Sequence, residues 1–337
     1  MRRQRKKEHV ENYLKSTFKS ETLFEDIYLE HNALPELKLD EINTKVEFLG
    51  KEVDYPIIIN AMTGGTEFTG EINKELSILA KEFNIPMAVG SETIILCEEE
   101  SCRQSFKITR ENVGESGIVM ANLNGHASIE DAKEAIEVID ADALQIHLNV
   151  AQELAMEEGD RDFTGILDNI ENLVKNISVP IVVKEVGFGL STDVIKRLYD
   201  VGIRYVDISG HGGTNFIEIE NLRNLSLDLN ELYDWGIPTA LSLINSTDLY
   251  DDLTVIGSGG VRNSLDVVKA LVLGADMVGI SGEILSYLVH GGIDNAREYL
   301  KDLTHKVKII MILLGVDNVE DLRKVDYKVT GRLKELL

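Results

Sequence analysis

The chain has 337 residues, with 34 basic and 58 acidic side chains and a formal net charge of −24 at pH 7. Such an acidic chain does not offer the basic surface that nucleic acids and anionic membranes require. It also has no apolar run of the roughly 20 residues that cross a bilayer, and no apolar segment follows its basic N-terminus as in a secretory signal. We therefore expect a cytoplasmic protein without nucleic-acid or membrane partners.

The first 50 residues show no clear repeat, but residues 2–7 form a basic cluster in an otherwise acidic chain. Beyond residue 50, short apolar runs alternate with segments of helical period. Runs of this kind are typical of parallel strands that are buried on both faces. The predicted strands are 57–60, 86–90, 118–122, 143–148, 180–185, 203–209, 253–257 and 276–281.

Helical period is clearest at residues 70–83, 129–139 and 264–273. Ser128 and Asn263 are expected to cap two of these helices, because short polar side chains accept from the first free N–H groups. An additional helix is expected around residues 235–245, and closing helices are expected after residue 291.

Eight strands, each followed by a helical stretch, predict a (β/α)8 TIM barrel, an α/β fold. An open doubly wound sheet is the alternative, although it needs fewer strands. We expect an N-terminal extension over residues 1–50 that forms a lid, and a barrel over residues 51–337. Cys97 and Cys102 are too few ligands for a zinc site and are expected to be reduced thiols.

The segment 256–263 reads IGSGGVRN and is followed by a strand that ends in Ser281-Gly282. Barrels commonly bind phosphate in the loops after their seventh and eighth strands. The glycines let backbone N–H groups approach a phosphate, and Arg262 can add charge, although a tight turn alone would also explain them. Flavin mononucleotide fits this pattern better than NAD, because no strand–GxGxxG–helix unit is present.

Lys184 ends the fifth predicted strand within an apolar run, where a buried ammonium group needs a negative partner. Over a flavin it could stabilise the anionic reduced form. Ser209, Thr214, Asn122 and Thr63 also follow or end strands and are suited to hydrogen-bond the polar parts of a flavin.

The segment 145–153 reads QIHLNVAQE, and its Gln145, His147 and Asn149 share one face of a strand and its exit. A structural histidine would also explain His147. Glu153 could complement a helix N-terminus or bind Mg²⁺, which takes one or two carboxylates together with substrate phosphates.

Together these motifs resemble one family, the type 2 isopentenyl-diphosphate delta-isomerases, which are flavin-dependent enzymes of isoprenoid synthesis. The resemblance covers residues 4 to about 285 and is weaker beyond. It is carried by QRKKEHV at 4–10, AMTGG at 61–65, AVGS at 88–91, QIHLNVAQE at 145–153, KEVGFG at 184–189, DISGHGGTNF at 207–216, IE..R at 219–223, GIPT at 236–239 and SGGVRNSLDVVKALVLGAD at 258–276.

The resemblance implies a barrel with FMN, Mg²⁺ and an isoprenoid diphosphate substrate, and a homotetramer or homo-octamer. Implied FMN contacts are Ala61, Met62, Thr63, Ser91, Asn122, Lys184, Ser209 and Thr214, with the phosphate at Gly260, Val261, Arg262, Ser281 and Gly282. Implied substrate contacts are Arg5, Lys6, His147, Asn149 and Gln152, with Glu153 as the metal ligand. Catalysis is implied at Lys184, Gln152 and His147.

The implied reaction is a 1,3-proton shift that interconverts isopentenyl and dimethylallyl diphosphate, in which reduced FMN acts as an acid–base catalyst. NADPH would serve only to reduce the flavin. The chain departs from the family at Glu92-Thr93, where many members have Gln-Arg, and at Gly282, where members often have a side chain.

Two other functions are considered. An FMN-dependent 2-hydroxy-acid oxidase or dehydrogenase would use His211 as its base, but such enzymes follow with an arginine where this chain has Thr214. The second alternative is a non-catalytic barrel that binds a phosphorylated ligand.

Overall fold

The fold is a closed barrel of eight parallel strands in a computed structural model of the chain. The structure describes residues 2–16, 20–97, 100–224 and 228–337, with the backbone alone for residues 2–7 and 95–97. The barrel strands, which pair in chain order until the last meets the first, are β4 (Ile57–Ile59), β5 (Met87–Ala88), β6 (Val119–Asn124), β7 (Ala143–Leu148), β8 (Ile181–Glu185), β9 (Tyr205–Asp207), β10 (Thr254–Ser258) and β11 (Met277–Ile280). This confirms the predicted (β/α)8 TIM barrel and all eight predicted strands.

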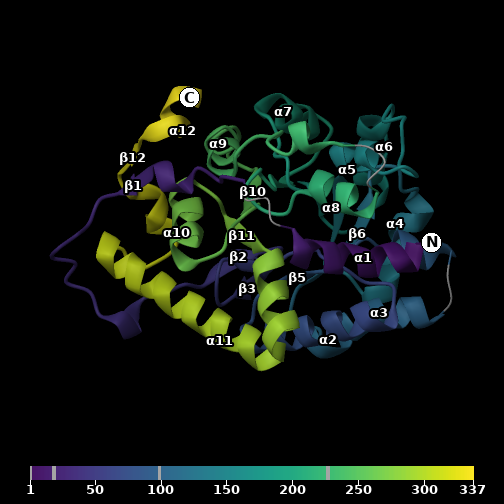
Figure 1. Ribbon diagram of the computed structural model, residues 1–337. Helices are drawn as coiled ribbons and strands as arrows, with labels where there is room; N and C mark the ends of the chain where they lie inside the picture. Colours follow the sequence, from purple (N-terminus) through teal and green to yellow (C-terminus); the bar gives the residue numbers. More distant parts are fainter. Residues whose placement is uncertain (1, 17–19, 98–99, 225–227) are drawn as a thin grey trace.

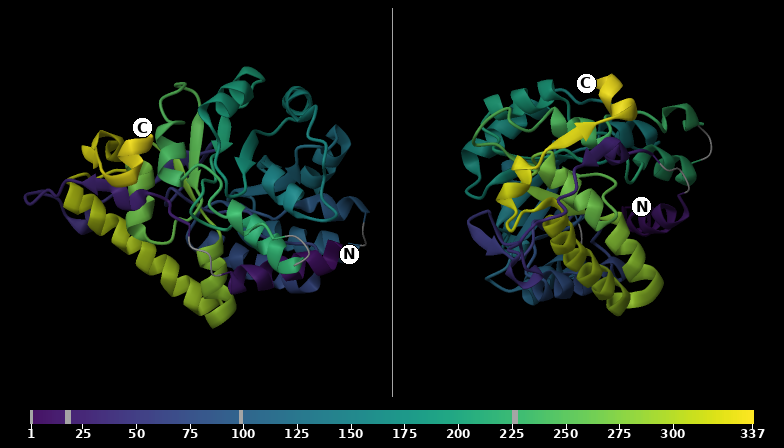
Figure 2. Two further views of the ribbon diagram at one scale, coloured as in Figure 1. Left: turned by 45° about the horizontal axis from the view of Figure 1, so that its top comes forward. Right: turned by 90° about the vertical axis from the view of Figure 1, so that its left-hand side faces the viewer.

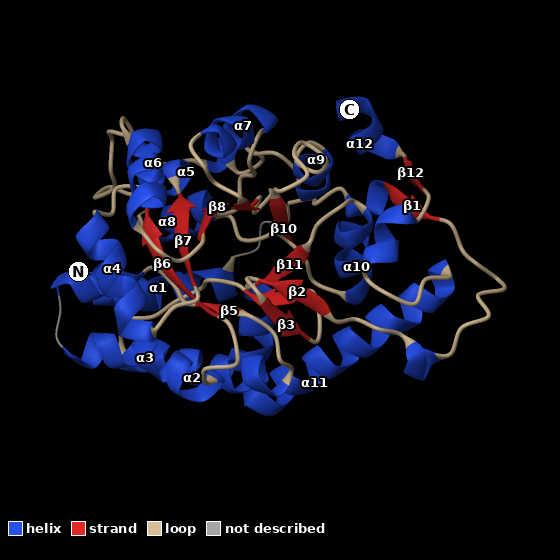
Figure 3. Cartoon of the chain, turned by 180° about the vertical axis from the view of Figure 1, so that it is seen from behind, coloured by secondary structure: helices blue, strands red, loops and turns tan. Residues whose placement is uncertain are grey.

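Helices surround the strands on the outside of the barrel (Figure 1, Figure 3). The helices that lie between barrel strands are α2 (Glu67–Glu82), α3 (Glu100–Val113), α4 (Ile129–Ile139), α5 (Val150–Ala155), α6 (Ile166–Asn176), α7 (Thr192–Asp200), α8 (Phe216–Arg223), α9 (Thr239–Ile244) and α10 (Ser264–Val272). Those near the ends of the chain are α1 (Arg2–Lys15), α11 (Gly282–Leu314) and α12 (Gly331–Leu336). Among the described residues, no helix is long and apolar enough to span a bilayer.

The two predicted caps are confirmed. The Ser128 side chain accepts from the N–H of Asp131 at the start of α4, and Asn263 accepts from Leu265 and Asp266 at the start of α10. The helix expected around residues 235–245 is shorter and begins at Thr239. Gly236 has a φ of +131°, which is not helical, and Pro238 occupies the N-cap position.

A hairpin of β2 (Val46–Phe48) and β3 (Lys51–Val53) covers the N-terminal end of the barrel. Phe48 and Val53 pack into the apolar core inside the barrel. The Phe48 ring also contacts that of Tyr205, the first residue of β9, edge to face with centroids 6.2 Å apart. The predicted boundary between residues 50 and 51 therefore falls inside one hairpin.

A second small sheet joins the two ends of the chain. Strand β1 (Ile27–Leu29) pairs antiparallel with β12 (Tyr327–Val329), away from the barrel strands (Figure 1). Asp26, just before β1, accepts from the N–H groups of Thr330 and Leu333. Lys269 of α10 adds a bond from its Nζ to the Phe24 carbonyl oxygen over 2.6 Å.

Asp142 links the hairpin to the barrel wall. Its carboxylate lies 2.6 Å from Lys51 of β3, 2.6 Å from Arg110 of α3 and 2.8 Å from the N–H of Val119. Burial raises the pKa of Asp142, but these hydrogen bonds outweigh it and hold the pKa below the usual 3.8.

Asp142→Asn should lower the free energy of unfolding at pH 7 by about 1–3 kcal/mol, because hydrogen bonds to a charged group are lost. An acid whose pKa is lowered by folding contributes stability above its unfolded pKa and loses it on acidification. The difference between wild type and variant should therefore shrink as the pH falls below about 4. Denaturant titrations at several pH values measure this, and a pH-independent difference would contradict it.

Candidate functional site

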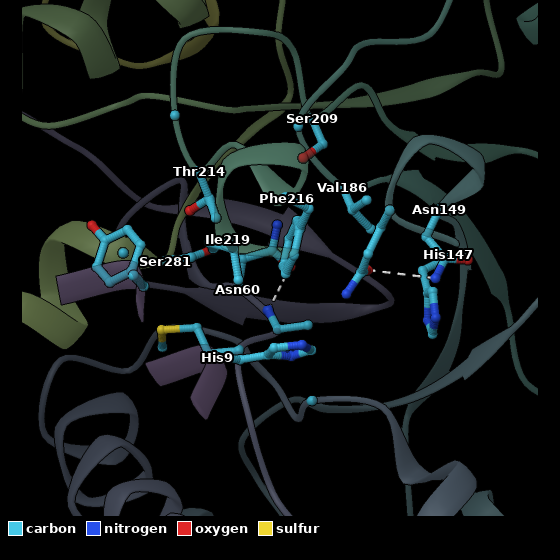
Figure 4. A pocket seen from close by; sticks show the side chains of 18 of the residues that line it. His9, Asn60, His147, Asn149, Val186, Ser209, Thr214, Phe216, Ile219 and Ser281 are labelled. Carbon is cyan, nitrogen blue, oxygen red and sulfur yellow. Dashed lines mark hydrogen bonds between the residues drawn. The ribbon is translucent and has the colours of Figure 1, made fainter. Parts of the chain in front are cut away.

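A cavity of about 640 Å³ opens at the C-terminal ends of the barrel strands, within the size range of ligand sites. Each barrel strand contributes to its lining through its C-terminal end or the loop after it, together with α1. Figure 4 shows His9, Asn60, His147, Ser209 and Thr214 around it, which come from separate parts of the chain. Parallel closure brings them together, since every strand ends on the same side.

Most of the predicted site residues line this one cavity. They are Ala61, Met62, Ser91, Asn122, His147, Asn149, Gln152, Glu153, Lys184, Ser209, Thr214, Gly260, Val261, Arg262, Ser281 and Gly282. Thr63 does not line it, and its buried hydroxyl makes no hydrogen bond within the described residues. Arg5 and Lys6 lie on α1, but their side chains are outside the described part of the chain.

The helix α1 lies beside α8 (Figure 2). His9, Val10, Tyr13 and Leu14 of α1 all line the cavity. His9 Nε2 is 2.8 Å from a carboxylate oxygen of Glu220 on α8, and the His9 ring meets that of Phe216 edge to face at 6.0 Å. Residues of α1 therefore line the cavity, while β2 lies at the opposite end of the barrel.

One side of the cavity has the features of an anion site. Gly259 and Gly260 have φ values of +100° and +74°, and a Cβ on Gly260 would lie 2.3 Å from the Gly212 carbonyl oxygen. The nearby N-terminus of α11 has no side-chain cap among the described residues, whereas Asn263 caps α10. Uncapped N–H groups at a helix start favour an anion.

Gly282 and Tyr13 fit together at this helix start. An ideal Cβ on Gly282 would lie 2.1 Å from the Tyr13 hydroxyl oxygen, so glycine makes room for the tyrosine. Burial and the nearby Glu283 raise the pKa of Tyr13 to about 12, so its hydroxyl keeps its proton at neutral pH. At Gly282, where family members often have a side chain, the phenol of Tyr13 from α1 therefore occupies the space beside the backbone.

The chain also differs from many family members at Glu92 and Thr93, and these two side chains lie in different surroundings. Glu92 is fully buried, and its carboxylate accepts from the backbone N–H of Asn122 over 3.0 Å. Thr93 lines the cavity, with its hydroxyl 3.0 Å from that of Ser91. Thr93 therefore places a neutral hydroxyl at the position where many family members have an arginine.

Lys184 is 6% exposed and donates from Nζ to the carbonyl oxygen of Glu185 over 2.7 Å. One carboxylate oxygen of Glu185 in turn accepts backbone N–H groups from the next four residues, 186–189. Burial raises the pKa of Glu185 to about 7, while these N–H donors and Lys184 oppose the rise. The motif KEVGFG thus forms a turn around its own glutamate, and this turn holds Lys184 at the cavity.

The segment after β7 carries a polar cluster. Asn149 donates to Glu153 over 2.7 Å, and the other Glu153 carboxylate oxygen accepts the N–H of Asp160 over 2.9 Å. Arg161 holds the following loop by donating to the Glu153 carbonyl oxygen. No group of three or more histidine, cysteine or acidic side chains among the described residues could hold a metal ion, so Glu153 would be a single protein carboxylate on a metal.

Glu220, to which the sequence assigned no role, does not line the cavity but contacts His9 and Gln152, which do. Its side chain is 1% exposed, and it accepts from His9, Gln152 and Arg223. Burial raises its pKa, but the bonds from His9 and Arg223 outweigh this, so the pKa lies below the usual 4.5. The sequence signal was weak, because a glutamate and an arginine three residues apart also describe an exposed helical ion pair.

His211, the base of the alternative oxidase, does not line the cavity. Its Nε2 is 3.0 Å from the Tyr233 carbonyl oxygen, and the side chain is buried. The described geometry therefore does not place His211, the base of that alternative, at the cavity.

Comparison with known proteins agrees with the geometry. Residues 140–328 match the family model of FMN-dependent dehydrogenases. The isopentenyl-diphosphate delta-isomerase of Bacillus pumilus is 45% identical over 331 residues, which cover 98% of this chain and 92% of the relative. The enzyme of the same name from Geobacillus sp. is 43% identical and covers 98% of this chain and 94% of the relative.

Solved structures support the fold. A flavocytochrome b2 variant with pyruvate bound has a TM-score of 0.72 at 19% identity, covering 98% of this chain and 84% of that chain. A mandelate oxidase variant with a monooxide FMN adduct has a TM-score of 0.66 at 17% identity, covering 92% of this chain and 90% of that chain.

Gly282→Ala should displace Tyr13 and loosen α1, because the new methyl group would overlap the tyrosine hydroxyl. We expect faster amide hydrogen exchange in the α1 peptide covering residues 8–16, with α10 unchanged as the internal control. The double variant Gly282→Ala/Tyr13→Ala should exchange no faster than Tyr13→Ala alone. Additive effects of the two substitutions would show that Gly282 and Tyr13 act independently.

Proposed function

The chain belongs to the family of type 2, FMN-dependent isopentenyl-diphosphate delta-isomerases, and we propose that it interconverts isopentenyl and dimethylallyl diphosphate in the cavity at the barrel mouth. The observation that carries this proposal is the convergence of a buried lysine, a His–Asn–Gln–Glu cluster and an anion site on one cavity. Such an enzyme needs a polar centre and a place for two phosphate-bearing ligands.

The residues present fit FMN. The uncapped start of α11 and the glycines of the 256–263 loop form a cradle for its phosphate, to which Arg262, Ser281 and Gly282 would contribute. Asn122, Ser209 and Thr214 offer polar groups along the cavity wall for the rest of the cofactor. Ala61, Met62 and Ser91 would contact it from the β4 and β5 loops.

Reduced FMN, when bound, would supply proton transfer and an electron-rich surface, with no net redox change. Lys184 would hold negative charge in place, because its buried ammonium group is fixed by the turn around Glu185. Negative charge near the reacting carbons stabilises the carbocation character that develops when the alkene is protonated. NADPH is proposed only as the source of electrons for the flavin.

The substrate diphosphate is proposed to bind between α1 and the exit of β7. Asn149 and the doubly protonated form of His147 would donate to its oxygens, and Arg5 and Lys6 on α1 would add positive charge. Mg²⁺ is proposed to bind through Glu153 and the diphosphate together, since a single carboxylate suits a metal held mainly by substrate oxygens and water.

Gln152 is the proposed proton relay beside the reacting carbons. Its side-chain NH₂ group donates from Nε2 to Glu220 over 3.2 Å. The carbonyl oxygen of the amide is therefore the atom that would accept a proton. Glu220 would fix the orientation of this amide, and the His9 bond to the same carboxylate would couple that orientation to the position of α1.

Assembly into a homotetramer or homo-octamer and a cytoplasmic location complete the proposal. Exposed apolar side chains outside the cavity, among them Leu34 at 76% and Trp235 at 66% exposure, offer area for contacts between copies.

The test is an assay of purified protein with FMN, NADPH and Mg²⁺ on isopentenyl diphosphate. We expect dimethylallyl diphosphate to form, and Lys184→Ala to reduce the rate by roughly 10²-fold or more while circular dichroism stays unchanged. Absence of product from FMN-loaded wild type would refute the proposed reaction. A fully active Lys184→Ala enzyme would refute the role of the lysine alone.

Gly260→Ala should abolish retention of FMN through gel filtration, measured as flavin absorbance per protein, because its Cβ would clash with the Gly212 backbone in the phosphate cradle. Gly165→Ala is the matched control. Gly165 has a φ of +76°, close to the +74° of Gly260, but nothing lies within 4 Å of its Cβ position. The control should lose about 1–2 kcal/mol of stability from the left-handed backbone and keep its flavin. Equal flavin loss in both variants would mean that strain, and not the cradle, explains the effect.

A further inference from the structure

A row of buried hydrogen bonds crosses the barrel interior and ends at His147. We propose that Asn60, Gln145 and Asp207 are positioning residues that act through Asn122 to hold the proton of neutral His147 on Nδ1. The functional importance of this arrangement rests on the proposed role of His147 in binding diphosphate. The arrangement itself can be tested without substrate or cofactor.

The direction of the row is set at Asn60 by the backbone. The N–H of Ala61 lies 2.9 Å from Asn60 Oδ1, and because a backbone N–H can only donate, that side-chain atom must be the oxygen. The amide NH₂ of Asn60 therefore faces the other way, where it donates to Asp207 Oδ2 over 2.6 Å. A carboxylate accepts this bond in any orientation.

Each following amide is then fixed in turn. Gln145 donates from Nε2 to Asn60 Oδ1 over 3.1 Å, so its own oxygen faces Asn122. Asn122 donates from Nδ2 to that oxygen over 3.1 Å, so the Asn122 oxygen faces His147. His147 Nδ1 lies 2.7 Å from this oxygen, and since an amide oxygen can only accept, Nδ1 must carry the proton.

The other end of the row is held as firmly. Asp207 Oδ1 lies 2.5 Å from the hydroxyl of Ser258 and 3.2 Å from the backbone N–H of Ser209, which again can only donate. Exposure is 0% at Gln145 and Asp207 and at most 3% at Asn60 and Asn122. Reversing one amide in this buried row would set donor against donor, and an unsatisfied buried group costs about 1–3 kcal/mol.

The strand register explains why the row forms. Asn122 and Gln145 are paired across β6 and β7, so their side chains leave the sheet on the same side, toward the barrel axis. His147 lies two residues beyond Gln145 on the same face. With Nδ1 bonded to Asn122, Nε2 is the ring nitrogen at which the charge of His147 changes.

The test is ¹⁵N NMR of protein labelled at its histidines, recorded without FMN or substrate above the pH at which His147 titrates. The chain has seven histidines, and the His147 signals are identified by their loss in His147→Gln. We expect wild-type His147 to show a protonated Nδ1 and an unprotonated Nε2. Gln145→Met removes the middle of the row with a side chain of similar length, so Asn122 can turn either way and His147 should become a mixture of both tautomers.

Ser258→Ala is the matched control, because it removes one donor to Asp207 and leaves every link from Asn60 to His147 in place. It should keep the wild-type tautomer. A wild-type His147 protonated on Nε2 would overturn the proposal without any variant, and so would a folded Gln145→Met protein with an unchanged tautomer. Either result would leave the proposed isomerase activity untouched, since that activity is measured separately.

Discussion

Closure of the barrel is the constraint on which the rest of the structure depends. Along five of the eight barrel strands, the inward-facing residue near the C-terminal end is polar, while the inward-facing residue two positions earlier is apolar. The pairs are Ile58 and Asn60, Met120 and Asn122, Ala143 and Gln145, Val182 and Lys184, and Ile256 and Ser258. Because all strands run the same way, the apolar members form a core layer and the polar members form a layer above it, which carries the cavity.

Much of this arrangement is visible in the sequence. The strands could be predicted because buried parallel strands are continuous apolar runs, and Ser128 and Asn263 because capping is a local interaction. The polar residues at the strand ends could be assigned to one site, since closure brings all those ends together. What could not be predicted is which polar group meets which. Glu220 contacts His9, which is 211 residues away in the sequence, and no local sequence pattern predicts such a contact.

The acidic composition of the chain does not conflict with a site for anions. The candidate cradle relies on backbone N–H groups of glycine loops and of a helix start, which are electropositive whatever the net charge. Arg262 illustrates the local scale of this effect, since its guanidinium is held by the carbonyl oxygens of Gly212 and Gly260 inside the same loop cluster. The position of the N-terminal helix could not be predicted from the sequence. The sequence shows the basic cluster of this helix, but it does not show that Tyr13 packs against Gly282.

The pairing of β1 with β12 has a consequence for how the molecule is made. Its partners, Ile27 and Val329, are about 300 residues apart in the chain, so this sheet has a very high contact order and cannot form until synthesis is almost complete. The barrel strands can pair with their chain neighbours as they emerge from the ribosome. The segment that connects α1 to the barrel gains its second strand only when residues 327–329 arrive. The β1–β12 sheet would then form last, after the barrel strands have paired.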